Sequence, residues 1–123
     1  MQKKLDSILV LGLGKVGSLM ASMLHETGFE VTGADVQVRE VFPFAAKTLD
    51  VSSHDELQKT MQGFDAVISC LPYSFNIGVA TIANKLGIHY FDLTEDVPTT
   101  KAIIEMSQSS TAVMAPQCGL APG

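Results

Sequence analysis

The feature that most constrains this chain is a glycine-rich segment, Gly12-Leu-Gly-Lys-Val-Gly17, placed between two different hydrophobic patterns. Residues 7–12 form a continuous apolar run, which is typical of a strand buried on both faces. From Val16 onward the apolar residues recur at the spacing of one helix face, and Gly28 marks the expected end of that helix. The expected face consists of Val16, Leu19, Met20, Met23, Leu24 and Thr27.

The same alternation of strand and helix patterns continues along the rest of the chain. Further strands are expected at residues 30–35, 47–51, 65–70, 88–92 and 111–115. Helices are expected at residues 53–62, 74–86 and 97–107, while Pro43 leaves residues 37–46 undecided. Because parallel neighbours need long crossovers, this pattern predicts an α/β fold with a doubly wound parallel sheet of about six strands, order 3-2-1-4-5-6. A flavodoxin-like order of five strands is the alternative.

Composition narrows the classes of function. The 123 residues have the length of one domain, which we place at residues 1–123. With 8 Lys and Arg against 13 Asp and Glu, the formal net charge is −5, which argues against nucleic acid and against a basic membrane patch as partners. The apolar runs are too short to span a bilayer and no signal peptide is visible, so a cytoplasmic location is expected. The 2 cysteines form no CxxC motif, and no metal site is expected.

The glycine segment has the spacing GxGxxG in the context that a dinucleotide-binding Rossmann fold requires, directly after a strand and at the start of a helix. Gly12 would allow the tight turn, Gly14 the close approach of a diphosphate, and Gly17 the packing of the helix against the strand. Lys15 and Val16 lie at the helix N-terminus, which offers free N–H groups to an anion. A glycine-rich turn without a ligand is the alternative.

Asp35 ends the second expected strand, about 20 residues beyond the motif, where an acid accepts hydrogen bonds from the ribose hydroxyls of the cofactor. A carboxylate at this position repels a 2′-phosphate, so NAD is expected as the cofactor rather than NADP. Two alternatives remain open: Asp35 caps the following turn, or the nearby Arg39 accommodates a 2′-phosphate.

Several segments resemble the N-terminal cofactor domain of the saccharopine dehydrogenase family, and the resemblance covers essentially the whole chain. It is carried by Leu49-Asp-Val51, Asp65-Ala-Val-Ile-Ser-Cys-Leu-Pro-Tyr73, Tyr90-Phe-Asp-Leu-Thr94 and Ala115-Pro-Gln-Cys-Gly-Leu-Ala-Pro-Gly123. The resemblance implies an NAD(P)-dependent oxidoreductase that acts on a C–N bond of an amino-acid-derived substrate.

Carried over residue by residue, the resemblance implies further contacts with the cofactor. Asp50 and Val51 would line the adenine pocket, unless Asp50 is only a turn residue before the next helix. Cys70, Leu71 and Pro72 would leave the fourth strand where the dinucleotide passes. Cys70 itself is expected to be a small buried apolar residue rather than a nucleophile.

The catalytic residues are left unassigned. Cys118 and Gly119 follow the last expected strand and would lie near the nicotinamide end. Asp92, Glu95 and Asp96 form a cluster that either caps the helix at residues 97–107 or meets a substrate amine or the nicotinamide ribose.

The resemblance also implies that a substrate domain belongs downstream, so the chain is expected to be the truncated N-terminal part of a larger enzyme. Apolar surface left uncovered would then favour a homodimer. The alternative is a regulatory NAD(H)-sensing module of the kind that gates potassium transport, and a third interpretation is a structural domain with a vestigial site.

Overall fold

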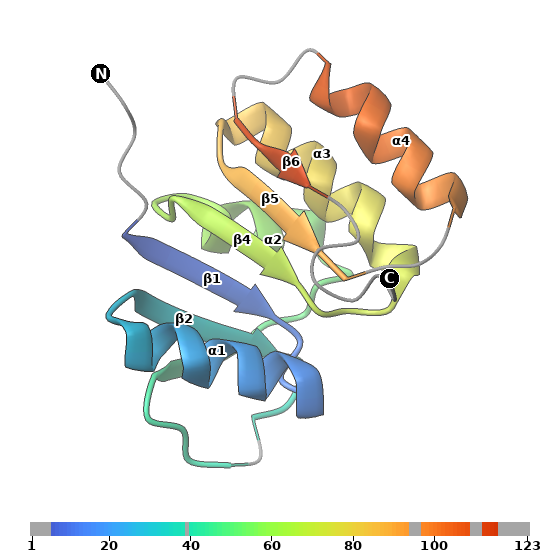
Figure 1. Ribbon diagram of the computed structural model, residues 1–123. Coiled ribbons are helices and arrows are strands. Elements are labelled where there is room, and N and C mark those ends of the chain that lie inside the picture. The colour runs from blue at the N-terminus through green and yellow to red at the C-terminus, as the bar shows by residue number, and fades with distance from the viewer. Residues whose placement is uncertain (1–5, 39, 94–96, 109–111, 116–123) are drawn as a thin grey trace.

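The computed structural model describes residues 6–38, 40–93, 97–108 and 112–115 of the chain, and Figure 1 shows a parallel sheet with helices on both faces. The described strands are β1 (Ser7–Leu11), β2 (Glu30–Asp35), β3 (Ala45–Thr48), β4 (Ala66–Ser69), β5 (His89–Asp92) and β6 (Met114–Ala115). The described helices are α1 (Lys15–Thr27), α2 (His54–Met61), α3 (Asn76–Leu86) and α4 (Val97–Ser107), with a 3-10 turn, η1 (Tyr73–Phe75), before α3.

The strands form one 6-stranded sheet in the order β3-β2-β1-β4-β5-β6, and all neighbours are parallel. This order confirms the predicted doubly wound fold. The chain moves toward one edge from β1 to β3 and toward the other edge from β4 to β6. Right-handed crossovers therefore place α1 on one face of the sheet and α2, α3 and α4 on the other, as Figure 1 shows. The carboxyl ends of all strands meet at one edge, and the switch point lies between β1 and β4.

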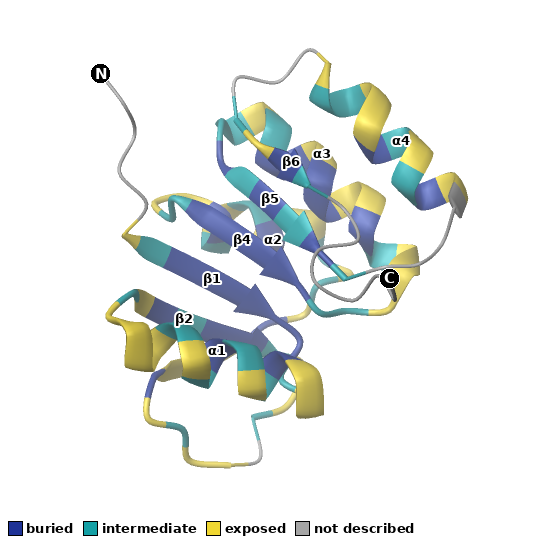
Figure 2. Ribbon diagram, in the orientation of Figure 1, coloured by how far each residue is buried: buried dark blue, intermediate teal, exposed yellow. Residues whose placement is uncertain are grey.

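The centre of the sheet is buried on both faces, as the dark blue strands in Figure 2 show. On β1, Ile8 and Val10 face the layer that contains α1, whereas Leu9 and Leu11 face the layer that contains α3. Each such side chain removed from water contributes roughly 1.5–3 kcal/mol to folding. The apolar run at residues 7–12 is therefore continuous because β1 is buried on both faces, as predicted.

Element boundaries differ from the expected ones mainly at the edges of the sheet. β3 covers Ala45–Thr48 instead of residues 47–51, because β2 ends at Asp35 and leaves no partner strand beyond Thr48. Leu49 then turns into the core, and its N–H donates to the carbonyl oxygen of Asp35 at 2.8 Å. At the opposite edge, the described part of residues 111–115 contains only the short β6.

Helix ends follow the local signals. Gly28 ends α1 and Gly87 ends α3 in the left-handed conformation. Ser53 caps α2, where the N–H of Glu56 donates to its Oγ at 3.4 Å. Among the described residues, no helix is both long enough and apolar enough to cross a lipid bilayer.

The expected apolar face of α1 is only partly right. Gly17 and Ala21 are buried, and Met20 and Leu24 pack partly against the core. The remaining residues of the expected face are exposed: Val16, Leu19, Met23 and Thr27. The apolar stripe in the sequence is wider than the contact with the sheet, and the small residues decide which side of the helix can approach it.

Candidate cofactor-binding site

The turn between β1 and α1 is built around Gly12. Its φ of 92° lies in the left-handed region, and its N–H donates to the carbonyl oxygen of Ala34 at 2.8 Å. A Cβ at this position would lie 2.9 Å from the carbonyl oxygen of Cys70. Both the backbone conformation and the lack of space therefore require glycine.

Gly17 brings α1 against this turn. A Cβ on Gly17 would lie 1.7 Å from the carbonyl oxygen of Gly12, so only glycine permits the approach. Gly14, the N-cap of α1, has the opposite surroundings, since a Cβ there would meet no atom within 4 Å.

The first turn of α1 faces this open space with its backbone. The N–H of Ser18 donates to the carbonyl oxygen of Gly14 at 2.9 Å as the first bond of the helix, so the amides of residues 15–17 precede the internal hydrogen bonds. The side chains of Lys15 and Val16 are exposed at the rim. Free amides and the positive end of the helix dipole make this a site for a phosphate group.

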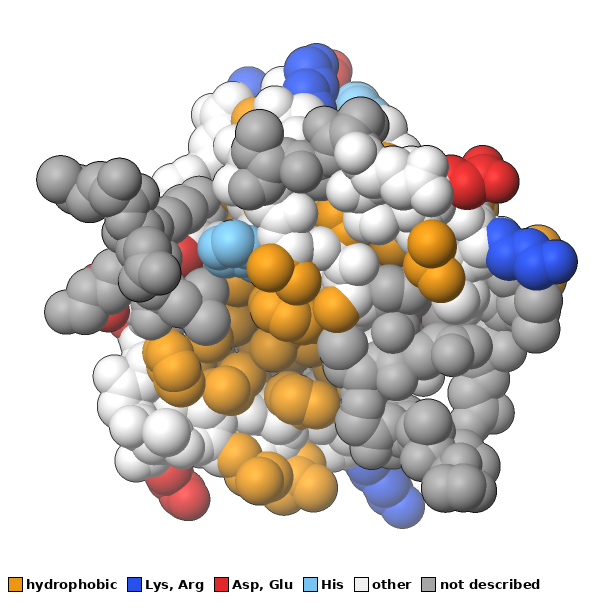
Figure 3. Space-filling view, turned by 45° about the horizontal axis from the view of Figure 1, so that its top comes forward, with side chains coloured by type: hydrophobic (Ala, Val, Ile, Leu, Met, Phe, Trp, Pro, Cys, Tyr) orange, Lys and Arg blue, Asp and Glu red, His pale blue; other side chains and the backbone are white. Residues whose placement is uncertain are grey.

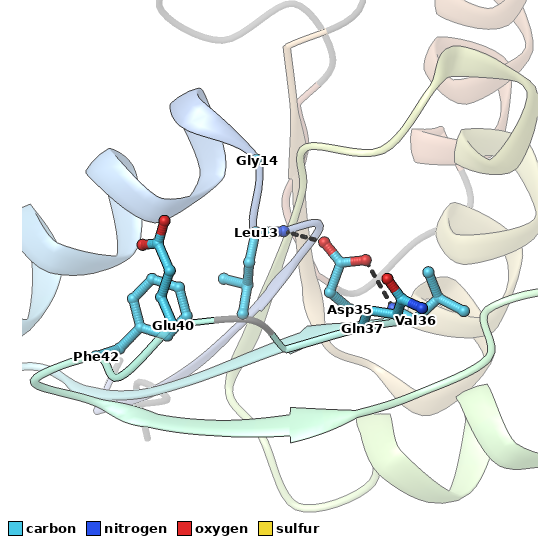
Figure 4. A pocket seen from close by; sticks show the side chains of 7 residues that line it. All are labelled: Leu13, Gly14, Asp35, Val36, Gln37, Glu40 and Phe42. Atoms are coloured by element: carbon cyan, nitrogen blue, oxygen red, sulfur yellow. Dashed lines mark hydrogen bonds between the residues drawn. The ribbon is translucent and has the colours of Figure 1, made fainter.

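Asp35 fixes the glycine turn from the end of β2 (Figure 4). One carboxylate oxygen accepts from the N–H of Leu13 at 2.7 Å, and the other accepts from the N–H of Val36 at 2.6 Å. The capping role considered for Asp35 is therefore present. Each oxygen has a second lone pair, so the same carboxylate is able to accept a hydrogen bond from a ligand hydroxyl.

A cavity of about 260 Å³ opens beside Asp35. It is lined by Leu13, Gly14, Asp35, Val36, Gln37, Glu40 and Phe42. Figure 4 shows Glu40 and Asp35 on opposite sides of the Leu13 side chain, so two carboxylates border the space. Sequence reasoning missed Glu40, although an acid soon after the end of the second strand was a usable signal. Arg39, the expected competing charge, lies outside the described residues.

Cys70, Leu71 and Pro72 follow β4 and lie next to the glycine turn. The N–H of Cys70 donates to the carbonyl oxygen of Leu11 at 2.8 Å, and a Cβ on Gly12 would lie 3.3 Å from the side chain of Leu71. The thiol of Cys70 packs against the core, and burial raises its pKa from 9.0 to about 11. The expected apolar role of Cys70 agrees with this packing. Pro72 is exposed and precedes η1.

Asp50 lies in the exposed turn between β3 and α2. Its Oδ1 accepts from the hydroxyl of Ser52 at 2.5 Å and from the N–H of Ser52 at 3.0 Å. The hydroxyl bond, followed by the N–H bond, lowers the pKa of Asp50 below the usual 3.8. The turn role considered for Asp50 is thus present, while its contact with adenine stays a prediction. Val51 is partly buried against the core.

Asp92, the described member of the expected carboxylate cluster, is buried. It is the last residue of β5 and is 0% exposed, and its Oδ2 accepts from the hydroxyl of Tyr90 at 2.5 Å. Its side chain lies on the same side of β5 as Tyr90, in the layer between the sheet and α3, and both roles considered for Asp92, the helix cap and the contact with a substrate amine or the nicotinamide ribose, stay predictions. Glu95, Asp96, Cys118 and Gly119 lie outside the described residues.

Nearby, a buried hydrogen bond that sequence reasoning missed joins β4 to α3. The hydroxyl of Ser69 donates to Oδ1 of Asn76 at 2.6 Å, and both residues are 1% exposed. The signal was weak: one polar residue at the end of an apolar strand and another at a helix start.

The geometry fits a dinucleotide at the carboxyl edge of the sheet. The open space over Gly14 and the free amides of α1 suit a diphosphate, and Asp35 borders an adjoining cavity that suits a ribose.

The comparison with protein families agrees with this geometry. The model described as the saccharopine dehydrogenase NADP binding domain matches residues 8–117. The chain belongs to the saccharopine dehydrogenase family. Within that family it is an NAD(P)-binding domain.

Solved structures with the same fold include dehydrogenases. Saccharopine dehydrogenase (L-Glu forming) from Saccharomyces cerevisiae is 22% identical, with a TM-score of 0.71 over 96% of this chain and 28% of that one. A probable dehydrogenase from Thermotoga maritima is 19% identical, with a TM-score of 0.69 over 89% of this chain and 35% of that one. Uronate dehydrogenase from Agrobacterium tumefaciens, complexed with NAD, is 13% identical, with a TM-score of 0.58 over 72% of this chain and 40% of that one. The chain thus spans about a third of the length of these proteins.

Proposed function

We propose that the chain is the NAD(H)-binding part of an oxidoreductase that acts on a C–N bond of an amino-acid-derived substrate. The observation that carries the proposal is the contact of Gly17 with the carbonyl of Gly12, which places the free amides of α1 beside the open space over Gly14. Family membership favours a dehydrogenase over a regulatory nucleotide-sensing module.

In this proposal the residues of the chain bind and orient the cofactor. The amides of residues 15–17 would hold the diphosphate, and Asp35 would accept hydrogen bonds from ribose hydroxyls. The segment from Cys70 to Pro72 would pass beside the cofactor on its way to the nicotinamide end. When bound, the nicotinamide supplies the hydride acceptor or donor. Substrate-binding and proton-transferring groups would come from the remainder of a longer protein, since the chain spans 28% of the yeast enzyme.

We also propose that NAD(H) is preferred over NADP(H). The description of the family names NADP. Our preference for NAD(H) rests instead on the charges that line the cavity of this chain. Asp35 and Glu40 both line the cavity in which the ribose would lie. A 2′-phosphate carries close to two negative charges, so two carboxylates beside it would cost binding free energy.

The binding test is a calorimetric titration of the chain with NADH, in which saturation below about 1 mM is expected. Gly14→Ala is the informative variant, because its Cβ meets no protein atom and would occupy the space of the diphosphate. It is expected to fold normally and to weaken NADH binding at least about tenfold. Gly78→Ala, in the first turn of α3 with equally open surroundings, is the matched control and is expected to bind as the original chain does. Absence of saturation by the original chain would refute the proposal.

The preference is tested by titration with NADPH in parallel. NADPH is expected to bind more weakly than NADH, and Glu40→Gln is expected to narrow the difference by about three- to tenfold. Glu40 is exposed, so the substitution leaves the core unchanged. Tighter binding of NADPH by the original chain would show that the carboxylates do not decide the preference.

A further inference from the structure

Two apolar surfaces lie on the face of the molecule that carries α1, and hydrophobic side chains gather there in Figure 3. The first, which we name the outer stripe, runs along the solvent side of α1. It consists of Val16, Leu19 and Met23, which are 49%, 62% and 59% exposed. Large apolar side chains grouped in this way mark interaction sites more often than scattered ones do.

The second surface, which we name the open sheet face, consists of Phe91 in β5 and Val113, the residue directly before β6. Phe91 is partly exposed and packs in the layer that contains α1, and Val113 is 51% exposed. Because Ala115 pairs with Phe91, alternation from Ala115 places Val113 on the same side of the sheet. Yet α1 packs on β1 and β2, whereas α3 and α4 pack on β4, β5 and β6 from the other side. Among the described elements, no helix covers Phe91 and Val113, although strands of parallel sheets are usually covered on both faces.

The two surfaces complement each other across a two-fold axis. In the arrangement that we consider, the α1-bearing faces of two copies meet, and the two-fold axis runs parallel to the strands. Rotation about this axis exchanges the half of the face that carries α1 with the half that carries the open sheet face, so α1 of each copy lies over β5 and β6 of the other. The outer stripe, which points away from its own sheet, meets Phe91 and Val113 of the second copy. Both sheets share one layer of two helices, and the contact is made twice, as an isologous interface requires.

Polar groups at the border match in the same arrangement. Glu26 is exposed near the C-terminal end of α1, and its spacing from Leu19 places it on the same side of the helix as the outer stripe. His89 begins β5 and shares the open sheet face with Phe91 by alternation. The Nδ1 of His89 accepts from the N–H of Val113 at 2.9 Å, so its other nitrogen carries the proton of the neutral ring. That N–H would donate to Glu26 of the second copy.

We propose that this chain forms a two-fold dimer in which the outer stripe of each α1 covers the open sheet face of the other copy. The proposal does not depend on cofactor binding. The occupant is a second copy because the described residues supply both halves of the contact, the exposed outer stripe and a sheet face that no described helix covers, and because Glu26 and His89 match across it.

The test is sedimentation equilibrium of the 123-residue chain at roughly 100 μM, where a dimer is expected. Leu19→Glu on the helix and Val113→Lys on the sheet change exposed residues, so the fold is retained, and each is expected to weaken dimerisation about a hundredfold or more. Ile104→Glu is the matched control, because Ile104 is 48% exposed on α4, on the opposite face, and this variant is expected to remain dimeric.

A mixture of the two interface variants gives the sharpest result. In a mixed dimer the outer stripe of the Leu19→Glu copy meets the sheet of the Val113→Lys copy, so both changes fall in one half of the interface with opposite charges. The other half keeps Leu19 and Val113. Mixing is therefore expected to restore a dimer that neither variant forms alone. A monomeric original chain, a monomeric Ile104→Glu control, or a mixture that stays monomeric would each overturn the proposal, and a monomer would leave a helix of a longer polypeptide as the cover.

Discussion

Cys70 shows how a single side chain reports on the packing around the glycine turn. Burial raises the pKa of its thiol from 9.0 to about 11, because the thiolate would lose water on the inner side of the turn. Well below pH 9 the thiol is almost fully protonated in both the folded and the unfolded chain, so its proton has almost no effect on stability. Between pH 9 and 11 the unfolded chain releases the proton first, so the free energy of unfolding falls over that window.

The measurement is the rate of iodoacetamide alkylation of Cys70 against pH, in a Cys118→Ser background so that only one thiol reacts. At pH 8 the folded chain is expected to hold about a hundredfold less thiolate than the denatured chain, and its rate is expected to rise with a midpoint near pH 11. The same chain in denaturant is the control. A folded-state midpoint near pH 9 would show that Cys70 is in contact with water and that the turn is looser than described.

At the scale of elements, the position of α1 on the sheet depends on one glycine. A Cβ on Gly17 would lie 1.7 Å from the carbonyl oxygen of Gly12, so Gly17→Ala forces the helix away from β1 and opens the core between them. The expected cost is about 2–4 kcal/mol of the free energy of unfolding, measured by urea denaturation. Gly78→Ala has open space in α3 and is expected to stabilise by roughly 0.5–1 kcal/mol. Equal effects of the two substitutions would contradict the close approach.

The order and type of the elements could be predicted because each strand and helix carries its own period, and the glycine motif indicates which connection comes first. The buried side of α1 could not be predicted with the same success. Val16, Leu19 and Met23 extend the apolar stripe beyond the contact, and the side that faces the sheet is selected by Gly17, whose role depends on a backbone oxygen of another element.

The residues of the candidate site also differ in how well the sequence predicted them. Asp35 was predictable because the strand that precedes it and its distance from the motif fix its place at the carboxyl edge. Glu40 lies in a loop without periodicity, so its place after the second strand was the one sequence signal, and the structure was needed to show that it lines the cavity. The burial of Asp92 was not predicted because acids are expected at surfaces, although its alternation with Tyr90 along β5 indicates the same buried side.

At the scale of the whole molecule, the site is an open edge rather than an enclosed chamber. The cavity beside Asp35 borders the proposed ribose position, and the segments that follow β5 and β6, where the nicotinamide would be expected, lie outside the described residues. Holding donor and acceptor in a reactive geometry supplies about 7–11 kcal/mol of a typical barrier reduction. Of the expected carboxylate cluster, the structure describes Asp92, which accepts a hydrogen bond from Tyr90 in the interior. A second copy would not complete the site, since the proposed dimer covers the α1 face and leaves the carboxyl edge open.

The 123-residue chain is therefore expected to fold and bind NADH yet to give no turnover. The assay follows the absorbance of NADH formed from NAD with saccharopine, lysine and related amino acids. Calorimetric binding of NADH in the same preparation shows that an inactive sample is folded and competent. Turnover by this chain would mean that groups outside the described residues, Glu95 and Asp96 among them, orient a substrate without a second domain. The proposal that this chain binds the cofactor while the remainder of a longer enzyme binds the substrate would then be wrong. Cofactor binding without turnover is the result expected from a diphosphate-binding helix N-terminus without a substrate-binding domain.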